Sequence, residues 1–249
     1  MVEYETKLAC NLQGEVIHGK RIFSKLFWAF NASIEGFPFC KRMIQVDGTW
    51  LYGKYGHILL IAVAQDGDSN IFQVAFAIVE KEDAEGWEFF LKHLRNHVVK
   101  EDGVCMISDR VIALLSLIDK DDSLWKPPHA YLAYCVRHIA ANAKTRFGNN
   151  QIRKEILDAV VQPKFDARIR KLRRHGQHVF DFANDIPRER WSQAYDEGRR
   201  YGHMTTNLAE AINFVLKGTR HLPIARIVWE TYFRLGKVWS TKDKKLTLG

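Results

Sequence analysis

Three hydrophobic runs follow one another between residues 43 and 80, and they predict three consecutive β-strands. The runs are MIQVDGTWL, HILLIAVAQD and IFQVAFAIVE, all rich in Val, Ile, Leu and Phe. Such short apolar runs between turn-forming residues are typical of buried strands. The links YGKYG at 52–56 and DGDSN at 66–70 separate the runs, and the second has the composition of a hairpin turn. Short links predict an antiparallel arrangement.

The hydrophobic period becomes helical after residue 82. In the segment 83–99, Trp87, Phe90, Leu91 and Leu94 recur at intervals of three and four residues, as on an amphipathic helix. The chain then predicts a strand in VCMISD, a helix in VIALLSLI, a strand in AYLAYCV and a helix in RHIAANAKTRF. The resulting order, β-β-β-α-β-α-β-α, is that of an RNase H-like mixed sheet, so the predicted fold class is α/β.

The chain divides into four predicted regions. Residues 1–40 are expected to be a partial N-terminal helical lead-in, because the apolar positions of RIFSKLFWAF at 21–30 have helix-like spacing. Residues 41–148 are the RNase H-like core. Residues 149–203 are polar and basic with little strand signal, so we expect an all-helical insertion there. Residues 204–249 are expected to add C-terminal core helices, among which the segment 206–217 has the firmest helical pattern.

Four cysteines lie far apart in the chain, at Cys10, Cys40, Cys105 and Cys135. No Cys-x-x-Cys pair occurs, which argues against a disulfide framework and a four-cysteine zinc site and fits a reducing compartment such as the cytosol or nucleus. We also find no apolar run of about 18 residues, so no membrane association is expected. The first thirty residues mix acids and bases with apolar positions, unlike a secretory signal.

The net charge of +8 is unevenly distributed along the chain. Residues 1–135 hold 14 Lys/Arg against 18 Asp/Glu, residues 136–200 hold 15 against 8, and residues 201–249 hold 8 against 3. A basic half favours a polyanion such as nucleic acid, although basic side chains also keep surfaces soluble. The densest cluster, RIRKLRR at 168–174, gives the predicted DNA-binding residues Arg168, Arg170, Lys171, Arg173 and Arg174. The cluster could equally be a nuclear import signal or a solvated helix face.

Two aspartates end predicted buried strands. Asp47 is followed by Gly48 and Thr49, and Asp109 follows Ile107 and Ser108. A carboxylate is costly to bury unless a cation or a hydrogen-bond donor compensates it, and a divalent cation shared by both residues would do so. The alternative is that each aspartate simply begins a turn, as this residue often does. Their positions on the first and fourth predicted strands favour a metal site.

A third acid lies on the predicted helix at 206–217. Asn207, Glu210 and Asn213 recur every three residues beside the apolar stripe of this helix, so one carboxylate and two amides can face a single point. Alternatively, Asn207 could be the N-cap and Glu210 could close a capping box. Three carboxylates suit Mg²⁺ or Mn²⁺, which prefer oxygen ligands, and two such ions can serve phosphoryl-transfer chemistry.

Long segments of the chain resemble the central domain of plant Mutator-like element (MULE) transposases. They are residues 42–95, VCMISDR at 104–110, PHAYLAYCVRHIAANAKTRF at 128–147 and WSQAYDEGRRYGHMTTNLAEAINFVLKGTRHLPI at 191–224. The resemblance spans about residues 20–240. It implies a DDE-type RNase H-like catalytic domain with an all-helical insertion before the last acid. It also implies that Asp47, Asp109 and Glu210 are the catalytic and metal-binding residues, with two Mg²⁺ or Mn²⁺ ions.

The family also has a Cys-x-x-His signature after the second aspartate, which Cys135 and His138 match. We interpret this pair, with Asn207 and Asn213, as near-site residues, and the alternative is a buried cysteine beside a satisfied histidine. Two departures stand out. Val111 and Ile112 occupy positions where many relatives have His-Lys. No counterpart of the family's N-terminal zinc-containing region or C-terminal SWIM zinc finger is recognisable, which puts recognition of element ends in doubt.

The resemblance implies a divalent-metal-dependent nuclear transposase that cuts DNA at transposon ends and joins it to target DNA. DNA is therefore the expected partner, and no small-molecule substrate is expected. Whether copies of the chain form homo-oligomers is left open. The alternatives are a domesticated, non-catalytic DNA-binding transcription regulator of the far-red-impaired-response type, or an inactive fragment.

Overall fold

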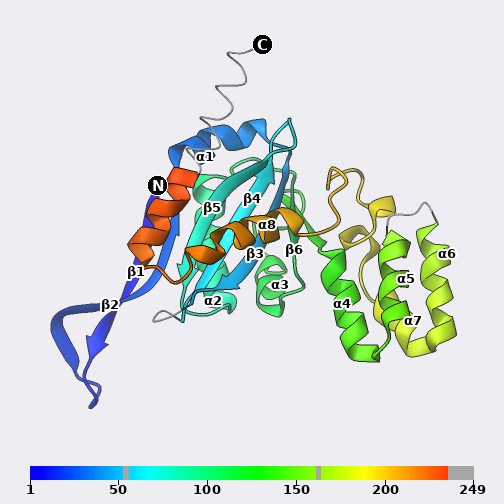
Figure 1. Ribbon diagram of the computed structural model, residues 1–249, viewed down its shortest axis with the longest axis horizontal. Helices are drawn as coiled ribbons and strands as arrows, with labels where there is room; N and C mark the ends of the chain where they lie inside the picture. The colour runs from blue at the N-terminus through cyan, green and yellow to red at the C-terminus, as the bar shows by residue number, and fades with distance from the viewer. Residues whose placement is uncertain (53–55, 161–163, 235–249) are drawn as a thin grey trace, which may run out of the picture.

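The computed structural model describes residues 1–52, 56–160 and 164–234, which form a mixed α/β structure around one seven-stranded sheet (Figure 1). The strands are β1 (Val2–Cys10), β2 (Val16–Trp28), β3 (Met43–Trp50), β4 (Ile58–Gln65), β5 (Ile71–Val79), β6 (Val104–Ser108) and β7 (Ala130–Tyr134). Their order in the sheet is β1-β2-β5-β4-β3-β6-β7. The neighbours from β1 to β3 pair antiparallel, whereas β3–β6 and β6–β7 pair parallel.

The three strands predicted between residues 43 and 80 are confirmed as β3, β4 and β5. The DGDSN turn also forms as predicted. The Asp66 amide donates to the Asn70 carbonyl at 3.1 Å, and the Asn70 amide donates to the Asp66 carboxylate at 2.8 Å. In the other predicted link, residues 53–55 lie outside the described part of the chain. Beyond these strands, α2 (Ala84–His97), β6, α3 (Ile112–Ile118), β7 and α4 (Val136–Phe147) follow in the predicted order.

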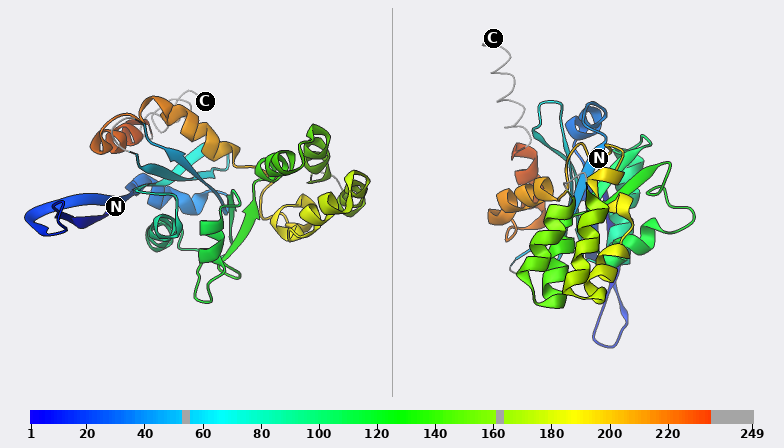
Figure 2. Two further views of the ribbon diagram at one scale, coloured as in Figure 1. Left: turned by 90° about the horizontal axis from the view of Figure 1, so that it is seen from below. Right: turned by 90° about the vertical axis from the view of Figure 1, so that its right-hand side faces the viewer.

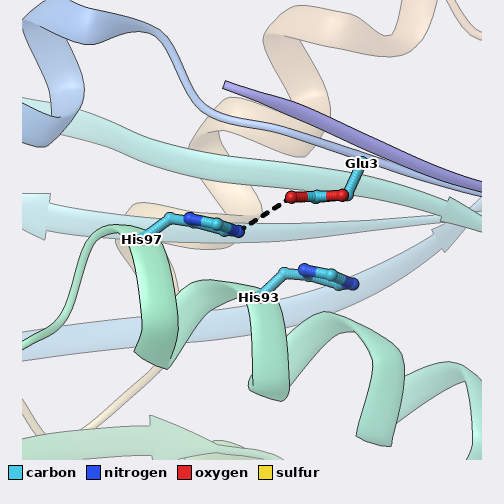
Figure 3. A group of neighbouring side chains, drawn as sticks. All are labelled: Glu3, His93 and His97. Carbon is cyan, nitrogen blue, oxygen red and sulfur yellow. Dashed lines mark ion pairs between the residues drawn. The ribbon is translucent and has the colours of Figure 1, made fainter.

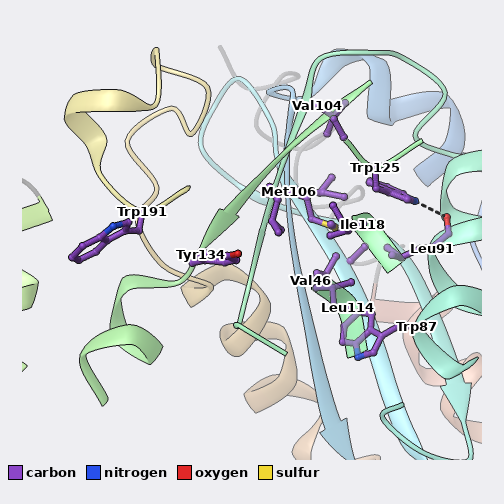
Figure 4. Close-up of a cluster of buried hydrophobic side chains, with 14 of the residues drawn as sticks. Val46, Trp87, Leu91, Val104, Met106, Leu114, Ile118, Trp125, Tyr134 and Trp191 are labelled. Carbon is purple, nitrogen blue, oxygen red and sulfur yellow. Dashed lines mark hydrogen bonds between the residues drawn. The ribbon is translucent and has the colours of Figure 1, made fainter. Parts of the chain in front are cut away.

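Two hydrophobic layers cover the sheet because successive side chains of a strand point to opposite faces. In β4, Leu60 and Ala62 belong to the larger core, which α2 and α3 cover, whereas Leu59 and Ile61 belong to a second core under α8 (Asn207–Val215). Figure 4 shows part of the larger core, where the Trp125 indole donates to the Leu91 carbonyl at 3.3 Å. The site described below lies on the α8 side of the sheet.

The predicted helical insertion forms a separate group beside the β7 edge of the sheet, next to α4 (Figures 1 and 2). It contains α5 (Asn150–Val160), α6 (Phe165–Lys171), η2 (Leu172–His175) and α7 (Gln177–Asn184). The all-helical expectation for 149–203 holds only in part. Beyond α7 the chain has two short 3₁₀ turns, η3 (Arg188–Arg190) and η4 (Gln193–Tyr195), around the fully buried Trp191. Pro187 and the positive-φ residues Gly198 and Gly202 interrupt regular helix there.

The predicted helical lead-in at residues 1–40 is wrong over most of its length. Residues 2–28 form the long β1–β2 hairpin, which extends away from the rest of the molecule (Figure 1), and only α1 (Asn31–Gly36) and η1 (Phe37–Phe39) follow it. The pairing shifts register between Glu5↔Lys25 and Thr6↔Phe23, which leaves Ser24 as an extra residue in β2. This bulge breaks the alternation of apolar and polar positions, so the segment 21–30 imitates a helical period.

No helix among the described residues is both long and apolar enough to cross a membrane.

Candidate active site

Asp47 and Asp109 occupy equivalent positions on two neighbouring parallel strands. The paired residues of β3 and β6 run from Met43↔Cys105 to Gln45↔Ile107 and differ by 62 positions. Asp47 and Asp109 differ by the same 62 positions. They therefore continue this row on the face that carries Met43, Cys105 and Ile107. Asp109 directly follows β6, as predicted, but Asp47 does not end its strand, because β3 continues through Gly48 and Thr49 to Trp50 in pairing with β4.

Cys135 extends the same row to the third parallel strand. The β6–β7 pairs end at Ser108↔Tyr134, so Cys135 stands next to Asp109, and its amide donates to the Ser108 carbonyl at 2.9 Å. Cys135 is also the N-cap residue of α4. His138 lies in the first turn of this helix, and its Nδ1 is 2.6 Å from Asp109 Oδ1. Ligand atoms of Asp109, Cys135 and His138 all lie within 4.8 Å of one another.

The contacts of His138 change the protonation of its neighbourhood. The contact with Asp109 and then that with Cys135 raise the pKa of His138 to about 10, so this imidazole is charged at neutral pH. Burial opposes ionisation of the Cys135 thiol, yet hydrogen bonds involving His138 and Thr206 lower its pKa overall. The predicted near-site pair thus contacts the second acid directly.

Helix α8 lies on the same face as the two aspartates because a strand residue caps it. Gln45 Oε1 of β3 accepts hydrogen bonds from the backbone amides of Leu208 at 2.8 Å and Ala209 at 3.4 Å. These amides belong to the first turn of α8 and would otherwise lack partners. One turn further along the helix, Asn213 Nδ2 donates to Asp47 Oδ2 at 2.6 Å. The near-site role expected for Asn213 is therefore a direct contact with the first acid.

The capping-box interpretation of Asn207 and Glu210 is wrong. The N-cap residue of α8 is Thr206, whose carbonyl accepts from the Glu210 amide at 2.9 Å. Asn207 is the first helical residue, and its side-chain oxygen accepts a hydrogen bond from Arg137 at 2.7 Å. The helix thus begins one residue earlier than the capping box requires, because Gln45 already satisfies the amides of its first turn.

The Glu210 carboxylate adds negative charge near Asp47 and is itself paired with the Arg137 guanidinium. Its Oε2 accepts from Arg137 Nη1 at 2.9 Å, and its Oε1 accepts from Thr206 Oγ1 at 3.3 Å. Burial first, and then the charges of Asp109 and Glu210, raise the pKa of Asp47 to about 7. Among the described residues, however, the three acids do not form a group whose ligand atoms all lie within 4.8 Å of one another.

The three acids provide hard oxygen donors of the kind that Mg²⁺ or Mn²⁺ prefers. The side-chain oxygen of Asn213 can serve as a further metal ligand, because it is buried and makes no hydrogen bond within the described structure. Burial first, and then repulsion from the neighbouring carboxylates, raise the pKa of Asp47, and a divalent cation would compensate both. The chemistry of these residues therefore fits a divalent metal ion, which would have to take the place of His138 at Asp109 and of Arg137 at Glu210.

Two charged residues near the site had no distinguishing signal in the sequence. Arg137 lies between the two residues of the Cys-x-x-His signature and contacts Glu210. Glu82, in the link between β5 and α2, is a fourth carboxylate, and partial burial together with the charge of Asp109 raises its pKa. Its carboxylate reaches so close to Gly48 that a Cβ atom on this glycine would lie 2.8 Å from Glu82 Oε1. Only the folded arrangement reveals either contact.

This close approach predicts how the Gly48→Ala substitution will behave. We expect the alanine to displace the Glu82 carboxylate and to destabilise the chain by less than about 1 kcal/mol, because the atoms that its methyl group meets are at the end of a flexible side chain. In a Glu82→Ala background the same substitution is expected to cost nothing measurable, since the space is then free. Urea unfolding of the four variants measures this coupling. An equal loss in both backgrounds would refute the contact.

The predicted DNA-binding residues lie on α6 and η2, in the helical group beside β7. Their apolar neighbours Phe165, Ile169 and Leu172 are buried, so the basic side chains form the outer face of an amphipathic segment. Arg174 is paired with Glu155 at 2.5 Å, and the Arg173 guanidinium lies 4.1 Å from the centre of the Phe180 ring. The remaining three are Arg168, Arg170 and Lys171, and the last two are exposed. They leave positive charge available to a polyanion.

Residues 43–142 match the family model of the MULE transposase domain. The match begins with β3, which carries Asp47, and ends within α4, so it includes Asp109, Cys135 and His138 but not Glu210. This match confirms, for this segment, the resemblance to MULE transposases that the sequence indicated. No curated protein matches the chain significantly.

Proposed function

We propose, from the MULE transposase domain at residues 43–142, that the chain is the catalytic core of a DDE-type transposase. It would cleave a DNA strand at an element end and join the freed 3′-hydroxyl to target DNA in the nucleus. The observation that carries this proposal is the arrangement of the acids. Asp47 and Asp109 continue one row of parallel strands, and Glu210 approaches the same face on α8 closely enough to raise the pKa of Asp47.

The wiring of the sheet supports an RNase H-like assignment of this core. From β3 onward the elements follow the order β-β-β-α-β-α-β-α, and the sheet order β5-β4-β3-β6-β7 puts the first strand in the middle. Asp47 within β3 and Asp109 at the carboxyl end of β6 therefore lie next to each other inside this five-stranded part of the sheet. A site built there is supported on both sides by paired strands, which fixes the carboxylates more rigidly than a surface loop would.

Asp47, Asp109 and Glu210 would hold two Mg²⁺ or Mn²⁺ ions, and Asn213 would orient Asp47 through the hydrogen bond it already makes. When bound, such ions activate the attacking oxygen and stabilise the leaving oxygen of a phosphodiester. The protein side chains hold the site in shape, while Arg137 and His138 supply positive charge beside Glu210 and Asp109. If metal ions occupied their places beside the acids, Arg137 and His138 could instead contact the phosphates of a bound DNA strand.

An assay of plasmid nicking tests this function. The purified chain is expected to convert supercoiled DNA to the open-circle form with Mn²⁺ or Mg²⁺, and not with EDTA or with Ca²⁺ alone. Joining of an oligonucleotide with a free 3′-hydroxyl to the plasmid would demonstrate strand transfer. Nicking that persists in EDTA would contradict a metal-dependent mechanism.

A second candidate function is DNA binding without catalysis, as in a domesticated transposase that regulates transcription. One observation favours it: Asp109 and Glu210 already have cationic partners in His138 and Arg137, so the site is compensated by the protein's own side chains. In that case the chain would bind DNA in a mobility-shift assay yet nick no plasmid at any Mn²⁺ concentration. The two assays together separate the two functions.

The basic segment on α6 and η2 predicts the salt dependence of DNA binding. If the exposed Lys171 contacts a phosphate, Lys171→Ala should reduce the slope of log K against log salt by about 0.9. Fluorescence anisotropy of a labelled duplex at several salt concentrations measures this slope. Lys20→Ala is the matched control, because Lys20 is also exposed but lies on the β2 arm. An equal change in both variants would exclude a specific contact.

A further inference from the structure

Two histidines and a glutamate lie close together at the β1 edge of the sheet, apart from the candidate active site. His93 and His97 lie one turn apart on α2, and Glu3 reaches them from β1 (Figure 3). Residues at i and i+4 share one helix face, so both imidazoles point in the same direction. Their rings are nearly parallel, with centroids 5.7 Å apart and an interplanar angle of 4°.

The ligand atoms of this cluster are already close together. Glu3 Oε1 lies 3.2 Å from His97 Nε2, and one ligand atom from each of the three residues lies within 4.8 Å of the other two. Tetrahedral coordination at metal–ligand distances near 2.0–2.2 Å needs ligand atoms about 3.4 Å apart. Small side-chain rotations would therefore bring the three groups to that spacing.

A simple ion pair does not account for all of this arrangement. The pair needs only His97 and Glu3, yet His93 is held against the same point by the rings of Phe89 and Phe27, whose centroids lie 4.6 and 5.5 Å away. Its Nδ1 is buried and has no hydrogen-bond partner among the described residues. His93 therefore places a third possible metal ligand next to the Glu3–His97 pair.

We propose that Glu3, His93 and His97 bind a divalent transition-metal ion, with Zn²⁺ as the ion that suits this ligand set best. Two imidazole nitrogens and one carboxylate oxygen are a common zinc donor set, and water completes the tetrahedron. The side chains of Glu3 and His97 are 40% and 21% exposed, so an ion can enter from solvent. This set differs from the carboxylate oxygens of the candidate active site, which suit Mg²⁺ or Mn²⁺.

A metal ion at this position would anchor β1, an edge strand of the sheet, to α2. β1 pairs with β2 on one side only, and α2 lies across the sheet beneath it. The ion would connect the first strand of the hairpin to a helix of the core. The site does not depend on the proposed transposase activity, because none of its residues belongs to the acids of the active site.

Titration of the metal-free full chain with Co²⁺ tests the proposal, because tetrahedral Co²⁺ gives visible absorption bands and Zn²⁺ competes for the same site. The parent chain is expected to bind one equivalent at this site. Loss of a ligand in His97→Gln or Glu3→Gln should weaken binding by more than about 100-fold. His18→Gln is the control, since this exposed histidine lies on the hairpin outside the cluster.

His138→Gln separates this site from the group formed by Asp109, Cys135 and His138. The proposal requires that His138→Gln retain the absorption that His97→Gln loses, and circular dichroism verifies that each variant is folded. If the bands disappear in His138→Gln and persist in His97→Gln and Glu3→Gln, the Co²⁺ is bound at the active site and the proposal is wrong. Absence of Zn²⁺-competable absorption in the parent chain would also overturn it.

Discussion

Replacing Asp109 by asparagine is expected to reduce metal-dependent DNA nicking at least about 1000-fold, a loss of about 4 kcal/mol of transition-state stabilisation. Asp109 stands in the row of parallel strands between Asp47 and Cys135, so its carboxylate is central to the proposed site. Asparagine has the same shape but carries no charge. Initial rates of plasmid nicking by parent and variant at equal Mn²⁺ measure the effect.

The matched control is Asp121→Asn, which removes the same charge from an aspartate whose side chain is fully exposed. This variant is expected to nick DNA at the parent rate. If Asp109→Asn also nicked at the parent rate while remaining folded, the activity would come from other residues or from a contaminating nuclease. An equal loss in both variants would indicate a general effect of charge.

Replacing Asp47 by asparagine is expected to stabilise the metal-free chain while abolishing nicking. Burial and the neighbouring acids raise the pKa of Asp47 from 3.8 to about 7, so the folded chain is penalised when this group ionises. The unfolded chain loses the proton near pH 4 and the folded chain only near pH 7. The penalty therefore grows between pH 4 and 7 and is complete above pH 7. Asparagine avoids it and can still accept the hydrogen bond from Asn213.

The expected gain at pH 8 is about 2 kcal/mol, which is roughly half the full conversion of the shift because Asp47 is only partly buried. Urea unfolding in EDTA at pH 8 and pH 4 measures it. The gain should fall to a small fraction of this value at pH 4, where Asp47 is protonated in the folded chain and only about half ionised in the unfolded chain. A stability difference independent of pH would contradict the ionisation of the buried Asp47 as its cause.

The strands and helices of the core could be predicted because each has a clear local pattern. The apolar runs of β4 and β5 and the three- and four-residue spacing of Trp87, Phe90 and Leu94 in α2 reflect burial directly. The paired residues of β3 and β6 differ by 62 positions, as Asp47 and Asp109 do, which explains why the two aspartates lie side by side. The sequence contains the apolar runs of both strands, but the register that aligns them is formed only by the sheet.

The remaining features depend on contacts between distant segments. The bulge at Ser24 interrupts the two-residue alternation by which strands are recognised, so the β2 segment was predicted to be a helix. Gln45 caps α8 across 163 positions, and this contact moves the helix start away from the predicted capping box. Glu82 and Arg137 carry no motif that separates them from ordinary surface charges. Their positions beside Gly48 and Glu210 follow from packing alone.

The central claim is that Asp47, Asp109 and Glu210 together hold divalent cations. Anomalous diffraction from crystals grown with Mn²⁺ and a DNA strand tests it most directly. We predict manganese peaks bounded by these three carboxylates, with His138 and Arg137 displaced from Asp109 and Glu210. Crystals in which the acids keep their cationic partners and no manganese peak lies between them would contradict the claim.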